Sequence, residues 1–397
     1  MMELSAQDLQ DGQTETREDR QERISWWDQS RLRQARVLVA GAGALGNEAL
    51  KNLALIGVGT LFIVDFDAIE LSNLSRTVLF REGDTGRRKA VVAAARLREL
   101  NPHIQVTPLD RDVSYDIGLG LFRRMDVVLG CVDNLLARIS LNRACFRVGV
   151  PYVDAGMLEL GGQVRTFIPP NPPCFECTVS TEGFADLDRR FSCPGLTRAE
   201  ILKGRAPTTQ TISAIIAGAQ AQEAVKLLHG LPVEPGSGLH FEGLSNSVDR
   251  IVETPSAECY GHWTFDPERI VPKPEATAAD TTVREVIEWG QELLGRGAVM
   301  ELGRDIVVSF VCPDCAEEEP VFAVRGQVDD SRLPCPRCGE LRQFALLSGE
   351  VALDSPFADR TLAQLGYPPL HILSVRRGAE YAHFELTGDE HRAMNAP

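Results

Sequence analysis

Short apolar runs alternate with stretches of helical periodicity through the first 155 residues of the chain. The runs at residues 35–40, 59–67, 104–108, 125–131 and 152–154 are rich in Val, Leu and Ile, which is typical of strands buried on both faces. Residues 47–58, 88–100 and 137–148 instead repeat apolar positions every three to four residues and predict helices. Strands that alternate with helices predict a doubly wound parallel sheet of Rossmann-like α/β type.

The rest of the chain is less regular. Residues 22–34 and 212–228 have helical spacing, residues 174–204 are irregular and polar, and residues 267–279 have the Pro, Ala, Thr and Glu content of a linker. Thr282 and Glu285 form a capping-box pattern ahead of a helix at 283–294, and strand-like runs follow at 371–376 and 381–386. We therefore expect an N-terminal arm (1–30), a main α/β domain (31–262) and a small α+β domain (263–397).

Composition and charge narrow the class of protein. A formal net charge of −15 argues against a general nucleic-acid binder. The polar first 22 residues resemble no signal peptide, and Gln220, Glu223 and Lys226 make the apolar segment 212–228 a poor membrane span. Ten cysteines without a secretion signal favour metal binding or thiol chemistry over disulfides. We expect a cytoplasmic protein with no membrane or nucleic-acid partner.

The sequence GAGALG between a strand and a helix matches the nucleotide-binding pattern G-x-G-x-x-G. It supplies Gly41, Gly43 and Gly46, and Asp65 follows 19 residues after the last glycine. The glycines allow close backbone approach, the helix N-terminus favours phosphate, and Asp65 can accept from a ribose hydroxyl. A tight turn without a ligand is the alternative, but strand, helix and acidic residue together favour a nucleotide.

Polar residues after the glycine loop favour a triphosphate over NAD. Asn73, Arg76 and Lys89 follow Asp65 closely, and three such groups suit three phosphates. Asp133 in CVDN comes at the end of a later strand, at the sheet edge where ligands of such folds bind. One carboxylate beside phosphates is a common way to hold magnesium. Each residue alone could be an ordinary surface charge.

Two C-x₂-C pairs, CPDC and CPRC, are separated by 19 residues. This is the spacing of a zinc ribbon, in which four thiolates surround one tetrahedral ion. Four free cysteines are a much weaker alternative. The predicted ligands are Cys312, Cys315, Cys335 and Cys338.

Between Arg36 and about His262 the chain resembles the adenylyltransferases that activate ubiquitin and ubiquitin-like proteins, whose bacterial relatives serve thiamine and molybdenum-cofactor synthesis. The resemblance rests on an ordered series of motifs. These are RVLVAGAGALGNE, IVDFDAIELSNLSR, the lysine of GRRKA, Asn101-Pro102, CVDN with Arg138 and Asn142, and CFEC.

The resemblance implies ATP- and magnesium-dependent adenylation of the C-terminus of a small ubiquitin-like protein by a homodimer. Asp65 would hold the ribose, Asp67 would belong to the same nucleotide site, and Asn73, Arg76 and Lys89 would hold phosphates. Asp133 would hold magnesium. An arginine of the N-terminal arm would reach the ATP of the partner subunit; Arg20 and Arg23 are the candidates, and Arg23 is preferred.

The same resemblance implies a second zinc site. Relatives follow the CFEC pair (Cys174, Cys177) with another C-x₂-C pair beyond the long helix and two strands. Here AECYGHW offers Cys259 and His262 at that spacing. Three cysteines and one histidine are an acceptable zinc ligand set. The alternative is that His262 is an ordinary surface histidine.

Three cysteines then remain. Cys131 and Cys145 lie in apolar elements and are expected to be small core residues. Cys193 lies in a polar segment between basic residues, which should lower the pKa of its thiol. Related activating enzymes place a thioester-forming cysteine in such a loop (178–206 here). Sulfur handling or a merely exposed thiol are the alternatives.

The favoured interpretation is a bacterial ubiquitin-like-protein activating enzyme that adenylates its substrate, forms a thioester at Cys193 and passes it to a conjugating enzyme. Similar bacterial operons point to antiviral defence. One alternative is a sulfur-carrier or peptide adenylyltransferase without a thioester. Another is a non-catalytic nucleotide-binding scaffold. An NAD-dependent oxidoreductase is disfavoured, because only the glycines support it.

Overall fold

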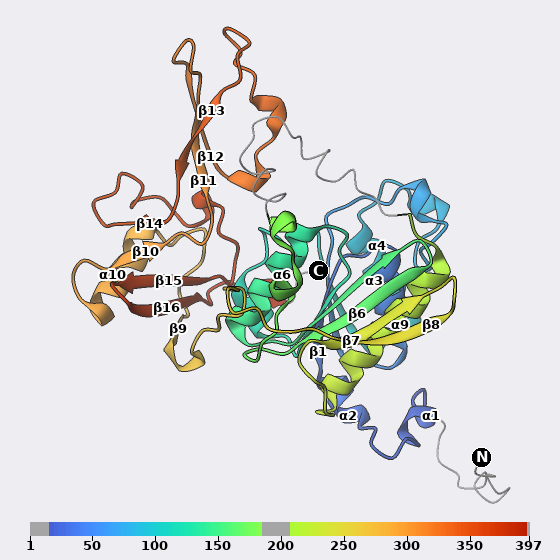
Figure 1. Cartoon of the computed structure of the whole chain (residues 1–397). Coiled ribbons are helices and arrows are strands. Elements are labelled where there is room, and N and C mark those ends of the chain that lie inside the picture. The colour runs from blue at the N-terminus through green and yellow to red at the C-terminus, as the bar shows by residue number, and fades with distance from the viewer. Residues whose placement is uncertain (1–15, 185–206, 395–397) are drawn as a thin grey trace, which may run out of the picture.

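A computed structural model describes residues 16–184 and 207–394 of the chain (Figure 1). Its largest element is an eight-stranded sheet in the order β3-β2-β1-β4-β5-β6-β7-β8. The first five strands are parallel and the last three are attached antiparallel, so the predicted α/β fold is confirmed. The strands are β1 (Arg36–Ala40), β2 (Thr60–Val64), β3 (Gln105–Leu109), β4 (Val127–Gly130), β5 (Tyr152–Leu158), β6 (Gly161–Phe167), β7 (Ser237–Glu242) and β8 (Ser247–Val252).

Helices cover both faces of this sheet, which explains the unbroken apolar runs of the strands. In β1, Val37 and Val39 face a core that includes helices α3, α4 and α9, whereas Leu38 and Ala40 face a second core with α5 and α6. The helices are α1 (Asp19–Glu22), α2 (Gln29–Gln34), α3 (Ala44–Leu55), α4 (Lys89–Leu100), α5 (Leu119–Arg123), α6 (Leu135–Val148), α9 (Gln210–Leu228), α10 (Val283–Leu294) and α11 (Glu390–Met394). No helix among the described residues has the length and apolar content that a membrane crossing requires.

The single helix expected over residues 22–34 is wrong. Helix α1 ends at Glu22, and α2 begins only at Gln29. The carboxylate of Asp28 accepts from the backbone N–H groups of Ser30 and Arg31, and this N-cap starts a new helix after a break.

The C-terminal module, residues 263–394, contains two further sheets. A five-stranded sheet has the order β14-β10-β15-β16-β9 and packs on α10, and a three-stranded sheet has the order β12-β11-β13. The capping box predicted for Thr282 and Glu285 is present at the start of α10. The strands are β9 (Ile270–Lys273), β10 (Val299–Glu301), β11 (Ile306–Val311), β12 (Glu318–Val324), β13 (Gln343–Leu347), β14 (Glu350–Val351), β15 (Ile372–Arg377) and β16 (Glu380–Leu386).

The linker expected over residues 267–279 is also wrong. Its residues 270–273 form β9, which pairs in parallel with β16. Because β9 is the edge strand, Pro272 does not interrupt the sheet, and Ile270 is buried.

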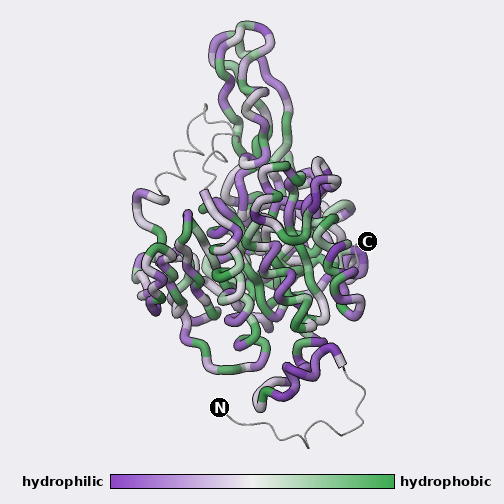
Figure 2. Tube along the Cα trace, turned by 90° about the vertical axis from the view of Figure 1, so that its right-hand side faces the viewer, coloured by the Kyte–Doolittle hydropathy of each residue, from purple (hydrophilic) through white to green (hydrophobic). Residues whose placement is uncertain are grey.

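The C-terminal module docks beside α5 and α6, and its three-stranded sheet projects away from the body of the protein (Figures 1 and 2). Glu385 of β16 is 1 % exposed and pairs with the guanidinium groups of Arg123 and Arg124 on α5. The backbone N–H of Gly120 donates to the carbonyl of Leu370 at 2.7 Å. A buried carboxylate paired with two arginines fixes the module against the sheet domain, because Glu385 without them would be a costly buried charge.

Candidate functional site

A cavity of about 340 Å³ opens at the carboxyl ends of the parallel strands. It lies between the neighbouring strands β1 and β4. The chain continues from β1 toward one edge of the sheet and from β4 toward the other edge, and ligands of doubly wound folds bind at such a reversal of strand order. Of the nine residues predicted for the nucleotide site, Gly46 does not line the cavity. The other eight do: Gly41, Gly43, Asp65, Asp67, Asn73, Arg76, Lys89 and Asp133.

The glycines of the loop differ in what their missing side chains allow. Gly41 has φ of +95°, a backbone conformation that side chains disfavour. A Cβ at Gly46 would lie 1.9 Å from the carbonyl oxygen of Gly41, so this glycine lets helix α3 pack against the loop. A Cβ at Gly43 would meet no atom of the described residues within 4 Å and would enter the cavity. The space at Gly43 therefore fits close approach by a ligand.

Asp65 holds the glycine loop in place. Its Oδ2 accepts from the backbone N–H of Ala42 at 2.7 Å, and its Oδ1 accepts from that of Asp67 at 2.8 Å. Burial raises the pKa of the Asp65 carboxyl, while Lys89 and the N–H of Ala42 act in the opposite direction. Each carboxylate oxygen keeps a lone pair that could accept from a hydroxyl group.

The cationic side chains that line the cavity bind acceptor atoms of the chain itself. Lys89 Nζ lies 2.7 Å from Asp67 Oδ2, and Arg76 donates to the carbonyl of Ser72 at 2.9 Å. The side-chain oxygen of Asn73 accepts from the N–H of Glu70. An anion entering this side would compete with Asp67 for the lysine.

Asp133 stands at the turn between β4 and α6. Its side chain is exposed, and Asn134 beside it caps α6 by accepting from the N–H of Ala137 at 2.9 Å. The positive end of the α6 dipole therefore lies at the cavity. A carboxylate at this position suits magnesium held between one protein ligand and phosphate oxygens.

A buried charge network behind the cavity has no role assigned from the sequence. Arg138 lines the cavity and contacts both carboxylate oxygens of Asp154, at 2.6 and 2.8 Å. Arg165 and the hydroxyl of Tyr152 also bond to Asp154, which is fully buried. The sequence signal that could have revealed this network is the aspartate inside the apolar run YVDAG. An aspartate buried in such a run requires charged or hydrogen-bonding partners.

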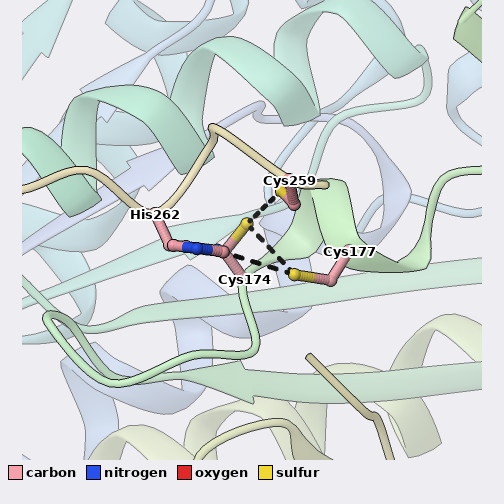
Figure 3. Close-up of side chains that lie close together, drawn as sticks. All are labelled: Cys174, Cys177, Cys259 and His262. Carbon is pink, nitrogen blue, oxygen red and sulfur yellow. Dashed lines mark hydrogen bonds between the residues drawn. The ribbon is translucent and has the colours of Figure 1, made fainter. Parts of the chain in front are cut away.

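The predicted ligands of the second zinc site come together around one point (Figure 3). The sulfur of Cys174 lies 3.8 Å from that of Cys177 and 3.6 Å from that of Cys259, and Cys177 Sγ lies 3.7 Å from His262 Nδ1. Zinc–sulfur bonds of about 2.3 Å at tetrahedral angles place two thiolates about 3.8 Å apart. A disulfide would require about 2 Å. The four donors therefore fit a zinc ion.

The four cysteines of the C-terminal module also cluster. Cys312 and Cys338 have sulfurs 3.4 Å apart, and those of Cys315 and Cys335 are 3.7 Å apart. The cluster lies at the end of the projecting three-stranded sheet, where the β11–β12 turn supplies the first pair. These four sulfur donors and their spacing also fit a zinc ion, separate from the one that the Cys174 cluster fits.

The remaining candidates divide into buried and undescribed residues. Cys131 and Cys145 are buried as expected, and burial raises the pKa of both thiols, that of Cys131 to about 12. Cys193 lies outside the described residues. Arg20 and Arg23 are exposed and do not line the cavity.

Comparison with known proteins gives one family and several relatives. The family model described as "ThiF family" matches residues 17–261. The sulfur carrier protein ThiS adenylyltransferase of Escherichia coli K12 is 34% identical over 219 residues, which cover 55% of this chain and 82% of that protein. The SAMP-activating enzyme E1 of Haloferax volcanii is 36% identical over 200 residues, covering 50% and 69%.

A solved structure supports the fold. The crystal structure of Escherichia coli MccB with MccA-N7isoASN superposes with a TM-score of 0.52 at 21% identity, covering 63% of this chain and 76% of that one. The similarity shows the same adenylation fold.

Proposed function

This chain belongs to the ThiF family, and on that premise we propose that it is an ATP-dependent enzyme that adenylates the C-terminal carboxylate of a ubiquitin-like protein. The observation that carries the proposal is the cavity, which gathers the glycine loop, Asp65, two cations and Asp133. A non-catalytic nucleotide-binding scaffold would share these residues, so pyrophosphate exchange, which requires adenylation, distinguishes the two.

The reaction joins two anions, because a carboxylate oxygen of the substrate attacks the α-phosphorus of ATP and pyrophosphate leaves. Arg76, Lys89 and Asn73 would neutralise and orient the phosphates, and Asp133 would hold magnesium. Asp65 would accept from the ribose. In the described structure Asp67 pairs with Lys89, so ATP would take over a lysine that is already positioned.

We further propose that Cys193 accepts the activated carboxylate. The thiolate would attack the acyl carbon of the adenylate, the bond to the phosphate oxygen would break, and AMP would leave with its electron pair. The described residues on both sides of residues 185–206 support this proposal. Thr208 lines the cavity, and Gly183 faces Leu135, whose neighbour Asn134 also lines it. The thioester would then pass to a conjugating enzyme.

Adenylation without a thioester is the second candidate. It is favoured by the relative named as a sulfur carrier protein adenylyltransferase, which is similar over most of its own length. Both candidates share the adenylation step and differ only in the role of Cys193.

The N-terminal arm supports homodimer catalysis. Arg17 donates to the carbonyl of Leu100, the last residue of α4. Leu100 lies near the amino ends of the parallel strands, whereas the cavity opens at their carboxyl ends. Arg20 and Arg23 follow within this arm, so neither serves the cavity of its own chain. Arg23, or else Arg20, of a second copy would reach the ATP.

Pyrophosphate exchange into ATP tests adenylation. We expect exchange that depends on a ubiquitin-like substrate and is lost in Lys89→Ala. Lys226→Ala is the matched control, because within residues 16–184 and 207–394 the Lys226 side chain forms an ion pair only with Glu223, one helical turn away, and it lies outside the cavity. Exchange that survives Lys89→Ala would contradict the assigned site.

A gel assay without reductant tests the thioester. We expect a thiol-sensitive adduct between enzyme and substrate that Cys193→Ala abolishes while exchange persists. Full exchange and no adduct in the wild-type enzyme would support the second candidate instead.

A further inference from the structure

Among the described residues, one that lines the nucleotide cavity comes from the C-terminal module. Gly326 lines the cavity together with the glycine loop and Asp65, although it is more than 250 residues away in the chain. It lies in the short 3₁₀ helix η6 (Arg325–Gln327), which directly follows β12. Gly326 is also outside residues 17–261, the part of the chain that the family model matches.

Gly326 packs on the turn formed by residues 112–116, which follows β3 and also contributes to the lining of the cavity. A Cβ at Gly326 would lie 1.8 Å from the hydroxyl oxygen of Tyr115 and 2.3 Å from its Cζ. Tyr115 itself lines the cavity. Only a glycine at position 326 therefore leaves the Tyr115 side chain where it is.

Two polar contacts hold the same turn. Gln327 Nε2 donates to Asp116 Oδ1 at 2.7 Å, and Asp116 Oδ2 accepts from the backbone N–H of Asp112 at 3.0 Å. Arg304 donates to the carbonyl of Tyr115 at 3.2 Å and to that of Gly366 at 2.7 Å. The contacts run without interruption from the module through Asp116 to Asp112, which lines the cavity.

The module that provides these contacts is fixed to the sheet domain elsewhere. Glu385 pairs with Arg123 and Arg124, so the position of η6 relative to the cavity is set by a second, independent attachment. Because the module is attached both at Gln327 and at Glu385, η6 keeps a fixed position beside the cavity.

We propose that the C-terminal module completes the nucleotide site, with Gly326 and Gln327 as positioning residues that act on ATP through Tyr115 and Asp116. The inference rests on the proposed function only in taking the ligand to be a nucleotide. Free energies of coupling are reciprocal, so ATP should also tighten the module at η6.

The experiment measures equilibrium binding of a non-hydrolysable ATP analogue with magnesium to the full chain. Gly326→Ala should weaken binding by about tenfold, because Tyr115 must leave its place, and Gln327→Ala by about threefold. Gly303→Ala is the matched control. It is the same substitution in the same module, and its Cβ would meet only the Arg147 side chain, at 4.0 Å. This variant should bind as the wild type does.

A double-mutant cycle separates positioning from general damage. In a Tyr115→Ala background the Gly326→Ala change should alter affinity by less than about twofold, because its clash partner is gone. Hydrogen exchange gives a readout that a purely structural role would not move: the nucleotide should slow exchange at residues 112–116 and 325–327 but not at 343–347.

The outcomes distinguish this inference from the proposed function. A wild-type chain that binds no nucleotide would overturn both. A wild-type chain that binds, with Gly326→Ala and Gln327→Ala binding equally well, would overturn only the role of the module. Additive losses for Gly326→Ala and Tyr115→Ala, or nucleotide-independent exchange at 325–327, would also overturn it.

Discussion

Two glycines of the same loop should respond differently to replacement by alanine, one through nucleotide binding and the other through the stability of the fold. At Gly43 the added methyl group has no atom within 4 Å in the part of the chain that the structure describes, and it enters the cavity. At Gly46 it meets the carbonyl oxygen of Gly41 at 1.9 Å. Gly43→Ala should therefore damage nucleotide binding and spare the fold, whereas Gly46→Ala should damage the fold.

The magnitudes follow from these two environments. Gly43 has φ of −72°, so alanine fits its backbone, and the lower entropy of the unfolded chain stabilises by about 0.4–1 kcal/mol. Gly43 is the N-cap of α3, where alanine costs a similar amount. The net change in unfolding free energy should stay within about 1 kcal/mol. Displacing a phosphate from one charge-assisted hydrogen bond costs about 1.5–3 kcal/mol, which weakens binding roughly 10- to 150-fold.

Gly46→Ala requires α3 and the loop to separate, and such overpacking typically costs about 1–3 kcal/mol or more of unfolding free energy. Urea unfolding measures the fold, and titration with MgATP measures binding. Wild-type affinity in Gly43→Ala would refute the placement of the nucleotide beside this glycine. Wild-type stability in Gly46→Ala would refute the close packing of α3 on the loop.

Three further predictions concern the rest of the molecule. Metal analysis should find about two zinc ions per chain, and His262→Ala should leave about one; one ion in the wild type would contradict one of the clusters. Glu385→Gln should lower the unfolding free energy in urea by about 1.5–3 kcal/mol, because the buried carboxylate loses its charge-assisted hydrogen bonds to Arg123 and Arg124. The half-exposed Glu390→Gln should cost under about 1 kcal/mol, and equal losses would contradict the role of the buried carboxylate. Burial lowers the pKa of His383 from 6.5 to about 4, so its neutral form contributes stability above pH 6.5 that is lost as the pH falls toward 4. His383→Gln should therefore flatten the pH dependence of unfolding across that window by roughly 3 kcal/mol, and an unchanged slope would exclude this group.

The parts of the fold that the sequence predicted are those with local signals. The run at residues 35–40, the glycine loop and Asp65 all lie within 31 residues, and their order is enough to place a ligand at the end of β1. The capping box of Thr282 and Glu285 is equally local, since it depends only on residues three apart. Local patterns of this kind survive because neighbouring residues satisfy them without help from the rest of the chain.

The parts that were missed depend on distant partners. Residues 270–273 have the composition of a linker and become a strand only because β16, more than 100 residues later, offers an edge to pair with. Asp154 could be noticed as a charge within an apolar run, but its partners Arg138 and Arg165 come from a helix and another strand. Gly326 had no local signal, because its significance arises only from the side chain of Tyr115.

Helix α6 runs between the Cys174, Cys177, Cys259 and His262 cluster of Figure 3 and the cavity. Asn142, fully buried in the second half of this helix, accepts from the N–H of Phe175 and donates to the carbonyl of Gly261, so it ties together the two segments that supply the cluster. The first turn of the same helix presents Arg138 to the cavity, while none of the four cluster ligands lines it. Both segments therefore support the far end of a helix whose N-terminus faces the cavity. This arrangement supports a structural role for an ion held by the cluster, which would act on the site only through the position of α6.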